Sequence, residues 1–580
     1  MINITNDDVR LLRQHEIIVK VKIEIINDTG QILGVVSGMV SDSCSSNIDS
    51  SSDVRRTFST TIVPDDTTKK KFDLSPASII WLNKYAHLYL GIKNLRTDEY
   101  RWFSQGYFVF TSNSITYNAT TNKLSISCSD FMTKLDGTIN GQLGALTTTI
   151  PAYEDEKDSN GNYVYESDGT TIKKKYNILR DAFVKTLSQL GGVDNYYVDD
   201  IGEFYGMKET NPTGYLEYRT KNPSWNYVPY DLEFNAGDSV CTMLQKIRDL
   251  YPDYQMYFDA DNKFILEMIP SLYEDNVTFN NAFLQSILLS SNGESTTRDY
   301  TAVKNCTKVW GKVIEVDNYT DTVTSSGDTY TATCKGYDTE GKGYLSGDKF
   351  GFKAPTTNVA GQKMIVTNGT TTYSSVAIYD DDTHDPIKAG VMIAGNDYVL
   401  KMNKEYNDGS YTYKWYLLGA YQVQGISVLT DGTVSDTDYV YTASDGTKTT
   451  CKVFSQQYFE LKYGCNNVEL NIVPGSPYTV QNIGERWKVL TGGEYENIEA
   501  NSLALARAHY ENWKSCRLTD SITITTLLVP WADVDIKVAY QMQNATEEST
   551  YIVKSVAQDY SAFTTTWTLS TFYPLYEPTK

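Results

Sequence analysis

The last eighty residues of the chain alternate apolar and polar side chains in a pattern that predicts one helix followed by four strands. The helix is expected over 501–513, and the strands over 520–526, 528–538, 551–556 and 564–569. Short strands separated by turns predict a small β-barrel, here with a helix laid across it. This block contains no recognisable catalytic set, so it favours a structural protein over an enzyme.

A similar block begins the chain. Alternating apolar residues from Ile17 to Ile25 share one face, and Asp28–Gly30 turns the chain into a hairpin. Further strands are expected over 56–63, 85–92, 102–110 and 123–128. We therefore expect a first barrel over residues 1–140.

Residues 141–303 mix helices with hairpins. A polar hairpin surrounds Asn160-Gly161, and an amphipathic helix is expected over 177–190. Asp238 is the expected N-cap of a second helix, which ends before Pro252 and leads into strands at 254–258 and 264–269. This segment predicts an α+β module.

A strand begins in 304–314 and is interrupted by residues 315–455, which are rich in Thr, Asp, Gly and Tyr and show no helical pattern. We interpret 315–455 as a β-rich insertion domain, and 304–314 together with 456–580 as a second barrel. The expected fold class is mainly β, with two barrels, an α+β domain between them and the insertion.

The net charge, the cysteine pattern and the absence of long apolar runs argue against several classes of function. The net charge of −21 argues against a surface that grips nucleic acid through its phosphates, which needs clustered Lys and Arg. The eight Cys residues are scattered without a CxxC motif, which predicts buried free thiols rather than a zinc site. The N-terminus lacks the features of a secretion signal, and no apolar run approaches the roughly 20 residues of a membrane span.

The candidate chemistry is sparse. Asp380–Asp385 has residue types that bind a divalent cation, but a solvated acidic loop is the alternative that we favour. Asp158–Asn162 could also form a cation-binding loop, but we favour a hairpin turn. The acidic pairs Glu233/Asp238 and Glu267/Glu274 could serve a glycosidase, although such pairs arise by chance among 72 acidic residues. We expect no catalytic residue, no metal and no cofactor.

Three aromatic residues in the insertion, Tyr411, Tyr413 and Trp415, alternate and would share one face of a strand. They are candidates for stacking on the sugar rings of a cell-wall glycan. The alternative is that they fill a β core or a subunit interface.

Four segments, in this order, resemble the tail hub proteins of bacteriophages, including the N-terminal region of tail-tip, tail-associated lysins. They are Trp102–Phe110, Lys123–Asp130 with the following Phe131, Met132 and Leu135, Asp238–Ile247 with the hairpin that follows it, and the closing block Ala500–Trp513, Pro530–Val538 and Tyr551–Val556. The resemblance spans roughly 400 residues of the chain, and the 315–455 insertion departs from the short family members.

The resemblance implies a homotrimer in which each chain supplies two tail-tube-like barrels, giving a pseudo-sixfold ring at the tail tip or baseplate of the virion. Its implied partners are the tail tube or distal tail protein on one side, tip, spike or tail fibre proteins on the other, and, as a further candidate, the tape measure protein. DNA would cross an acidic lumen without specific binding. Assembly is expected in the host cytoplasm.

Two other functions compete with this hub hypothesis. The chain could be a virion-associated adhesin whose insertion binds host cell-wall polysaccharide, or a peptidoglycan-cleaving tail lysin. The lysin hypothesis is the less favoured, because the sequence stops about where the second barrel stops, without a separate hydrolase domain.

Overall fold

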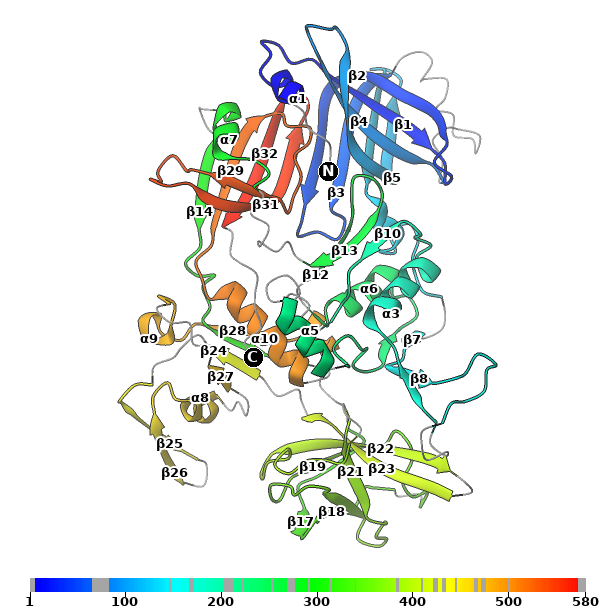
Figure 1. Cartoon of the computed structure of the whole chain (residues 1–580), viewed down its shortest axis with the longest axis vertical. Coiled ribbons are helices and arrows are strands. Elements are labelled where there is room, and N and C mark those ends of the chain that lie inside the picture. Colours follow the sequence, from blue (N-terminus) through cyan, green and yellow to red (C-terminus); the bar gives the residue numbers. More distant parts are fainter. Residues whose placement is uncertain are drawn as a thin grey trace.

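The computed structural model describes residues 6–571 apart from these positions: 65–82, 145–147, 166–171, 203–211, 222, 252–253, 269–276, 290–292, 312–315, 339–340, 382–384, 408–409, 421–425, 430–433, 444–445, 464–467, 471–475 and 499–500. Strands dominate, and the expected mainly β class is confirmed. The two barrels lie at one end of the molecule, the α+β module and helix α10 lie in the middle, and the insertion lies at the other end (Figure 1).

The first barrel contains six strands in the order β1-β4-β5-β6-β3-β2, and it closes because β1 also pairs with β2. Alternate side chains, such as Val21, Ile23 and Ile25 on β1, point into its core. The short helix α1 (Asn6–Leu11) precedes it. The strands are β1 (Val19–Ile26), β2 (Ile32–Asp49), β3 (Arg56–Pro64), β4 (Tyr85–Lys93), β5 (Tyr100–Asn118) and β6 (Lys123–Ser129).

The second barrel has five strands in the order β14-β29-β32-β31-β30. Its core includes the fully buried Trp567, whose indole N–H donates to the Thr526 hydroxyl at 2.9 Å. Helix α7 (Asn281–Ile287) packs against β29 and β30. The Tyr540 hydroxyl of β30 donates to Glu294 of β14 at 2.6 Å, so a side-chain contact spans the gap between the two outer strands. The strands are β14 (Glu294–Arg298), β29 (Asp520–Leu527), β30 (Lys537–Tyr540), β31 (Ser549–Asp559) and β32 (Thr564–Thr571).

The two helices and the hairpin predicted within residues 177–269 are present in the structure. The expected first helix is α3 (Leu179–Lys185) with a π turn over Thr186–Leu190, and the second is α6 (Val240–Arg248). Ser239, rather than the expected Asp238, caps α6 by accepting the Thr242 N–H. The remaining elements are β7 (Thr148–Ile150), β8 (Tyr153–Asp155), β9 (Lys174–Tyr176), β10 (Tyr196–Val198), α5 (Pro212–Lys221), β11 (Leu232–Phe234), β12 (Tyr254–Phe258) and β13 (Phe264–Met268).

The strand expected in 304–314 does not join the second barrel. It forms β15 (Cys306–Val309), which lies in a separate four-stranded sheet between β24 (Ile426–Leu429) and β28 (Trp487–Leu490), with β27 (Val468–Leu470) at the edge. Helix α10 (Asn501–Ser515) packs on β15 and β24 of this sheet, not across the barrel as the sequence suggested. The polar strand β14, expected in the α+β module, supplies the barrel strand instead, because it pairs with β29.

The expected insertion consists of two excursions from this four-stranded sheet. The first leaves after β15 and returns at β24, and it forms an eight-stranded sheet with its own core around Trp415. The second lies between β24 and β27 and carries the hairpin of β25 (Asp438–Thr442) and β26 (Lys448–Lys452) with helix α8 (Gln456–Tyr463). The strands of the first excursion are β16 (Asn318–Thr320), β17 (Val323–Ser326), β18 (Thr329–Thr333), β19 (Lys349–Lys353), β20 (Lys363–Thr367), β21 (Val376–Asp380), β22 (Asp397–Asn407) and β23 (Ser410–Ala420).

Asp130 connects the end of β6 to its surroundings. Its carboxylate accepts the N–H of Met132 at 3.0 Å, which caps the short 3-10 helix Phe131–Lys134, and the N–H of Arg56 at 2.8 Å. The residue is 1% exposed. Burial raises the pKa of the Asp130 carboxyl to about 6, although the hydrogen bonds oppose this shift.

We expect the melting temperatures of wild type and Asp130→Asn to diverge as the pH falls from 7 to 4.5. A raised pKa means that the folded chain binds this proton more tightly than the unfolded chain, so protonation stabilises the wild type below about pH 6, by up to about 2 kcal/mol. The variant lacks this proton uptake. Thermal denaturation across this pH range measures the difference; parallel profiles would contradict it. Asp98→Asn, at a side chain that is 85% exposed, is the control.

Candidate functional site at the barrel junction

The two barrels are joined into one sheet by β2 and β31. Residues 45–49 of β2 pair antiparallel with residues 559–555 of β31. Ser46 donates to the Gln558 side chain at 2.8 Å and bonds the Tyr560 hydroxyl at 2.6 Å, while Gln558 donates to the Val529 carbonyl at 2.7 Å. All three side chains are buried. Because their polar groups are satisfied, this network specifies how the barrels meet.

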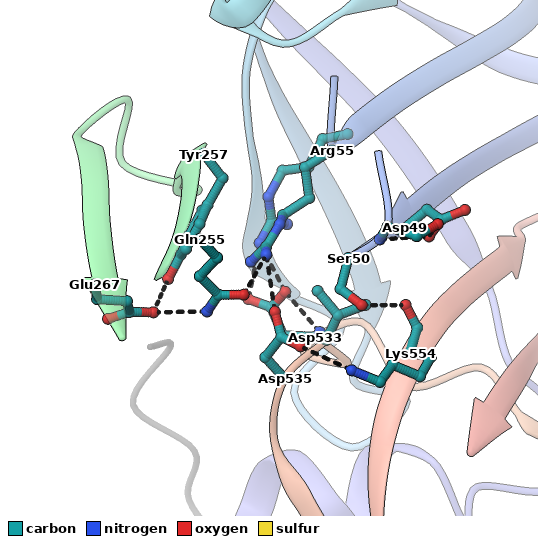
Figure 2. A network of polar contacts seen from close by, with 12 residues as sticks. Asp49, Ser50, Arg55, Gln255, Tyr257, Glu267, Asp533, Asp535 and Lys554 are labelled. Atoms are coloured by element: carbon teal, nitrogen blue, oxygen red, sulfur yellow. Dashed lines mark hydrogen bonds and ion pairs between the residues drawn. The ribbon is translucent and has the colours of Figure 1, made fainter. Parts of the chain in front are cut away.

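Arg55, in the turn between β2 and β3, reaches from the first barrel into the second and into the α+β module. Its guanidinium donates to Asp535 at 2.8 Å and to Gln255 at 3.1 Å, and it lies 3.6 Å from the centre of the Tyr257 ring. Figure 2 shows Gln255 and Tyr257 on one hairpin facing Arg55, with Glu267 accepting from both of them. One side chain thus contacts all three units.

Arg56 makes a second contact between the barrels. Its guanidinium donates to both carboxylate oxygens of Asp533, at 2.7 and 2.8 Å, in the loop between β29 and β30. The Arg56 side chain is 7% exposed and that of Asp533 is 43% exposed. Both bonds come from one nitrogen, Nη2, and they tie the end of the Arg56 side chain to this loop of the second barrel.

Burial dominates the electrostatics of this junction. It raises the pKa of Tyr257, and the charge of Glu267 adds to that rise. Burial also lowers the pKa of Lys554, which lies 4.0 Å from Asp535. The residues of this cluster are held by one another as donors and acceptors. We interpret it as a structural joint.

The structure separates the three aromatic residues that were expected to bind glycan. Trp415 is fully buried in the insertion core and packs against Tyr344 and Phe350. Tyr413 is half-buried at the margin of that core, and Tyr411 is 56% exposed, with the Lys404 ammonium 4.3 Å from its ring centre. The three share one face of β23, but only Tyr411 presents a largely exposed ring. Glycan stacking at Tyr411 stays a prediction.

A cavity of about 520 Å³ lies elsewhere in the insertion. Its lining residues are Asp338, Gly341, Lys342, Gly343, Asn368, Thr370, Thr371 and Tyr373. Asp338 already accepts the N–H groups of Lys342 and Gly343 and the Tyr373 hydroxyl. Its carboxylate is therefore committed to holding the loop.

The other candidate positions show contacts within the chain. The Asp158 carboxylate accepts the N–H groups of Asn160 and Asn162, as a hairpin turn requires. Residues 382–384 of the Asp380–Asp385 cluster, and Glu274, lie outside the described residues. Glu233 lies on β11 opposite Thr149 of β7, and Asp238 accepts the Asn235 N–H. Across the part of the chain that the structure describes, no three His, Cys, Asp or Glu residues are arranged to hold a metal ion.

The described cysteines, His87 and His509 are likewise embedded in packing or polar contacts, whereas His15 is exposed and His384 lies outside the described residues. The seven described cysteines are buried thiols without a disulfide among them, as expected, while Cys465 lies outside the described residues. Burial raises the pKa of the Cys44 and Cys241 thiols to about 12, which leaves little reactive thiolate. His87 stacks on Tyr107, and His509 bonds Glu469.

Sequence reasoning missed the junction residues Arg55, Arg56, Asp533 and Asp535. The available signal was two adjacent arginines in a turn and two acidic residues flanking Val534 in an otherwise apolar segment. Because their partners are 477 and 480 positions apart in the chain, the pairing itself left no local pattern.

One family model matches the chain over residues 475–576, and it is described only as a domain of unknown function, DUF5048. A search of curated proteins found no match. Among the helices that the structure describes, none combines the length and apolar character needed to cross a membrane.

Three solved structures are similar over nearly their whole length. The 43 kDa tail protein of prophage MuSo2 from Shewanella oneidensis is 8% identical, with 96% of this chain and 98% of that chain covered and a TM-score of 0.36. The tail protein from Neisseria meningitidis MC58 is 9% identical (95% and 96% covered, TM-score 0.33), and prophage tail protein gp18 from Listeria monocytogenes EGD-e is 7% identical (95% and 94% covered, TM-score 0.33). All three are described as tail proteins.

Replacing Arg55 by methionine should destabilise the fold by about 3–5 kcal/mol, because the buried charge of Asp535 would lose its close partner at 2.8 Å and keep only the more distant Lys554 at 4.0 Å. The double variant Arg55→Met with Asp535→Leu should recover much of this loss, since both charges are removed. Urea unfolding measures both effects. Arg10→Ala, which breaks an ion pair whose side chains are 77% and 83% exposed, should change little. A loss in the double variant as large as in Arg55→Met would contradict the explanation.

Trp415→Ala should lower stability by about 3–5 kcal/mol, since the indole is fully buried, whereas Tyr411→Ala should change stability by less than about 0.5 kcal/mol. The two positions lie on the same face of one strand, so each serves as the control for the other. Thermal denaturation of the two variants distinguishes a core position from a surface position. Equal losses would contradict this assignment.

Proposed function

We propose that the chain is a structural, non-enzymatic hub of a phage tail tip or baseplate. The observation that carries this proposal is the pair of barrels held side by side in one continuous sheet by β2 and β31. A subunit with two joined barrels supplies two units of a ring, so three copies supply six. Such a ring is three-fold in its subunits and pseudo-sixfold in its barrels.

This symmetry would let the ring join two different neighbours. The six barrels fit a six-fold tail tube or distal tail protein, and the three copies of the α+β module and insertion fit a three-fold tip, spike or fibre. The tape measure protein is a further candidate partner. In Figure 1 the barrels and the insertion lie at opposite ends of the molecule, which supports a connector with one face for each neighbour.

The charge of the chain suits a passage for DNA. Three chains of net charge −21 would repel the phosphates, so DNA would slide through the lumen without binding. The rigid junction of Arg55 and Arg56 with the second barrel would keep each pair of barrels aligned.

The purified chain should have a mass in solution near three times the 65.3 kDa of one chain, as measured by light scattering. Two-dimensional averages from electron microscopy should show a ring with a central hole. A chain that remains monomeric at tens of micromolar, or a compact oligomer without a hole, would contradict the proposal. The Tyr411→Ala variant is the matched control, because a surface change in the insertion should leave the mass unchanged.

A further inference from the structure

The second barrel repeats the strand order of the first. Read along the sheet, the first barrel contains β2-β3-β6-β5-β4 and the second contains β14-β29-β32-β31-β30. Matching these two rows places β14, β29, β30, β31 and β32 at the positions of β2, β3, β4, β5 and β6, which is also their order in the chain. The two barrels are therefore structural repeats, although long segments interrupt the second.

The hairpins that end the two repeats agree in detail. Four residues connect Asn118 to its partner Lys123, and four connect Asp559 to its partner Thr564. The Asn118 side chain accepts the N–H groups of residues 120 and 121, and the Asp559 side chain accepts those of residues 561 and 562. The last loop residue has a positive φ in both hairpins, 56° at Asn122 and 58° at Phe563. This agreement aligns the repeats residue by residue.

The alignment assigns an equivalent to each residue of the junction between the barrels. Following the strand registers, Ser46 on β2 corresponds to Thr296 on β14, and Gln558 on β31 corresponds to Tyr117 on β5. Ser46 and Gln558 pair with each other across the junction and are 6% and 1% exposed. Thr296 is exposed, and Tyr117 is 42% exposed. Positions that are buried where the repeats meet are thus open at their outer ends.

Within the described chain, each of the two outer ends also has a strand edge without a β-sheet partner. Strand β14 ends the sheet, and within the described chain it pairs only with β29. Strand β5 pairs with β4 over residues 100–109, so residues 115–118 have a strand partner on the β6 side alone among the described residues. In Figure 1, β14 and β5 lie on opposite outer sides of the pair of barrels. Unpaired edges of this kind are templates for another chain.

We propose that β14 of one copy pairs antiparallel with β5 of a second copy, residues 295–298 lying opposite residues 118–115. This contact would reproduce the β2–β31 ladder between chains, with Thr296 opposite Tyr117 and Thr297 opposite Thr116. It covers the exposed Tyr117 ring and leaves the β14 edge of the second copy open for the next. The contact joins two different surfaces, so it closes a ring when the rotation between copies permits. The pairing rests on the proposed ring and assigns its subunit interface.

Thr297 and Thr116 are suited to a disulfide test. Their equivalents, Asn47 and Ala557, lie opposite each other between hydrogen-bonded pairs, because Ser50 donates to the Lys554 carbonyl and Tyr560 donates to the Cys44 carbonyl. Opposed residues of that type have Cα atoms about 4.5 Å apart, within the range that a disulfide spans. All four side chains are exposed. The high thiol pKa values of Cys44 and Cys241 keep these native cysteines largely unreactive.

The experiment oxidises the full-length Thr297→Cys/Thr116→Cys variant and separates the products on a non-reducing gel. We expect covalent trimers at least ten-fold above those of the control Thr297→Cys/Ser125→Cys, whose second position lies one strand further away on β6. Co-expressing the two single variants should give covalent dimers only, because each chain then carries one engineered cysteine and can be linked to one other chain. Asn47→Cys/Ala557→Cys should form a bond within one chain and is the positive control.

The outcomes separate the interface from the ring itself. Trimers by light scattering together with the expected cross-link would support both. Trimers without the cross-link, or with equal cross-linking in the Ser125 control, would overturn the β14–β5 pairing and leave the ring standing. A monomer at tens of micromolar would overturn both. As an independent check, Thr296→Pro should reduce the trimer at least ten-fold, since residue 296, the equivalent of Ser46 in a hydrogen-bonded pair, would donate its N–H to the second copy. A monomer that retains the wild-type melting temperature would exclude misfolding.

Discussion

The backbone ladder between β2 and β31 is the constraint on which the rest of the molecule depends. It makes one sheet out of strands that lie at opposite ends of the chain, and the registry of 45–49 with 559–555 fixes the second barrel against the first. The turn that follows β2 then lies beside the loop between β29 and β30, which brings Arg55 to Asp535 and Arg56 to Asp533. The same turn contacts the β12–β13 hairpin through Arg55, so it also positions the α+β module against the barrels.

Residues 299–519, between β14 and β29, do not disturb the second barrel because the two ends of this segment are held together. Arg298 at the end of β14 donates to both oxygens of Asp520 at the start of β29, at 2.5 and 2.7 Å. Extending a loop adds little entropic penalty once its ends are held, since the closure term grows only with the logarithm of length. The four-stranded sheet under α10 provides a second point of closure, from which the insertion leaves after β15 and returns at β24.

Local pattern was sufficient for the elements whose burial is one-sided. The alternation in β1 and β32, the amphipathic helix α6 and the hairpin around Asn160 all carry their own periodicity, and each was predicted. Partners were not predictable in the same way. Strand β14 reads Glu-Ser-Thr-Thr-Arg, with no apolar alternation, so nothing marked it as a barrel strand, and the strand at 306–309 was given to the wrong sheet. In the sequence the junction arginines resemble ordinary surface residues, and Arg55 is buried by partners from distant segments, such as Asp535 and Tyr257.

The insertion has a further consequence for how such a chain can change over time. Its eight-stranded sheet has its own core and lies at the end of the molecule away from the barrels (Figure 1). The chain enters this sheet after β15 and leaves it before β24, and these two strands pair with each other. A gene segment encoding that domain could therefore be exchanged for another with closely spaced ends, while every hydrogen bond of the barrel sheet stays in place. Selection on the barrels and selection on the insertion would then act on one polypeptide almost independently. The sequence of the barrels would change slowly, because the strand edges that join the copies must stay complementary. The sequence of the insertion domain would change with the molecular surface that it contacts.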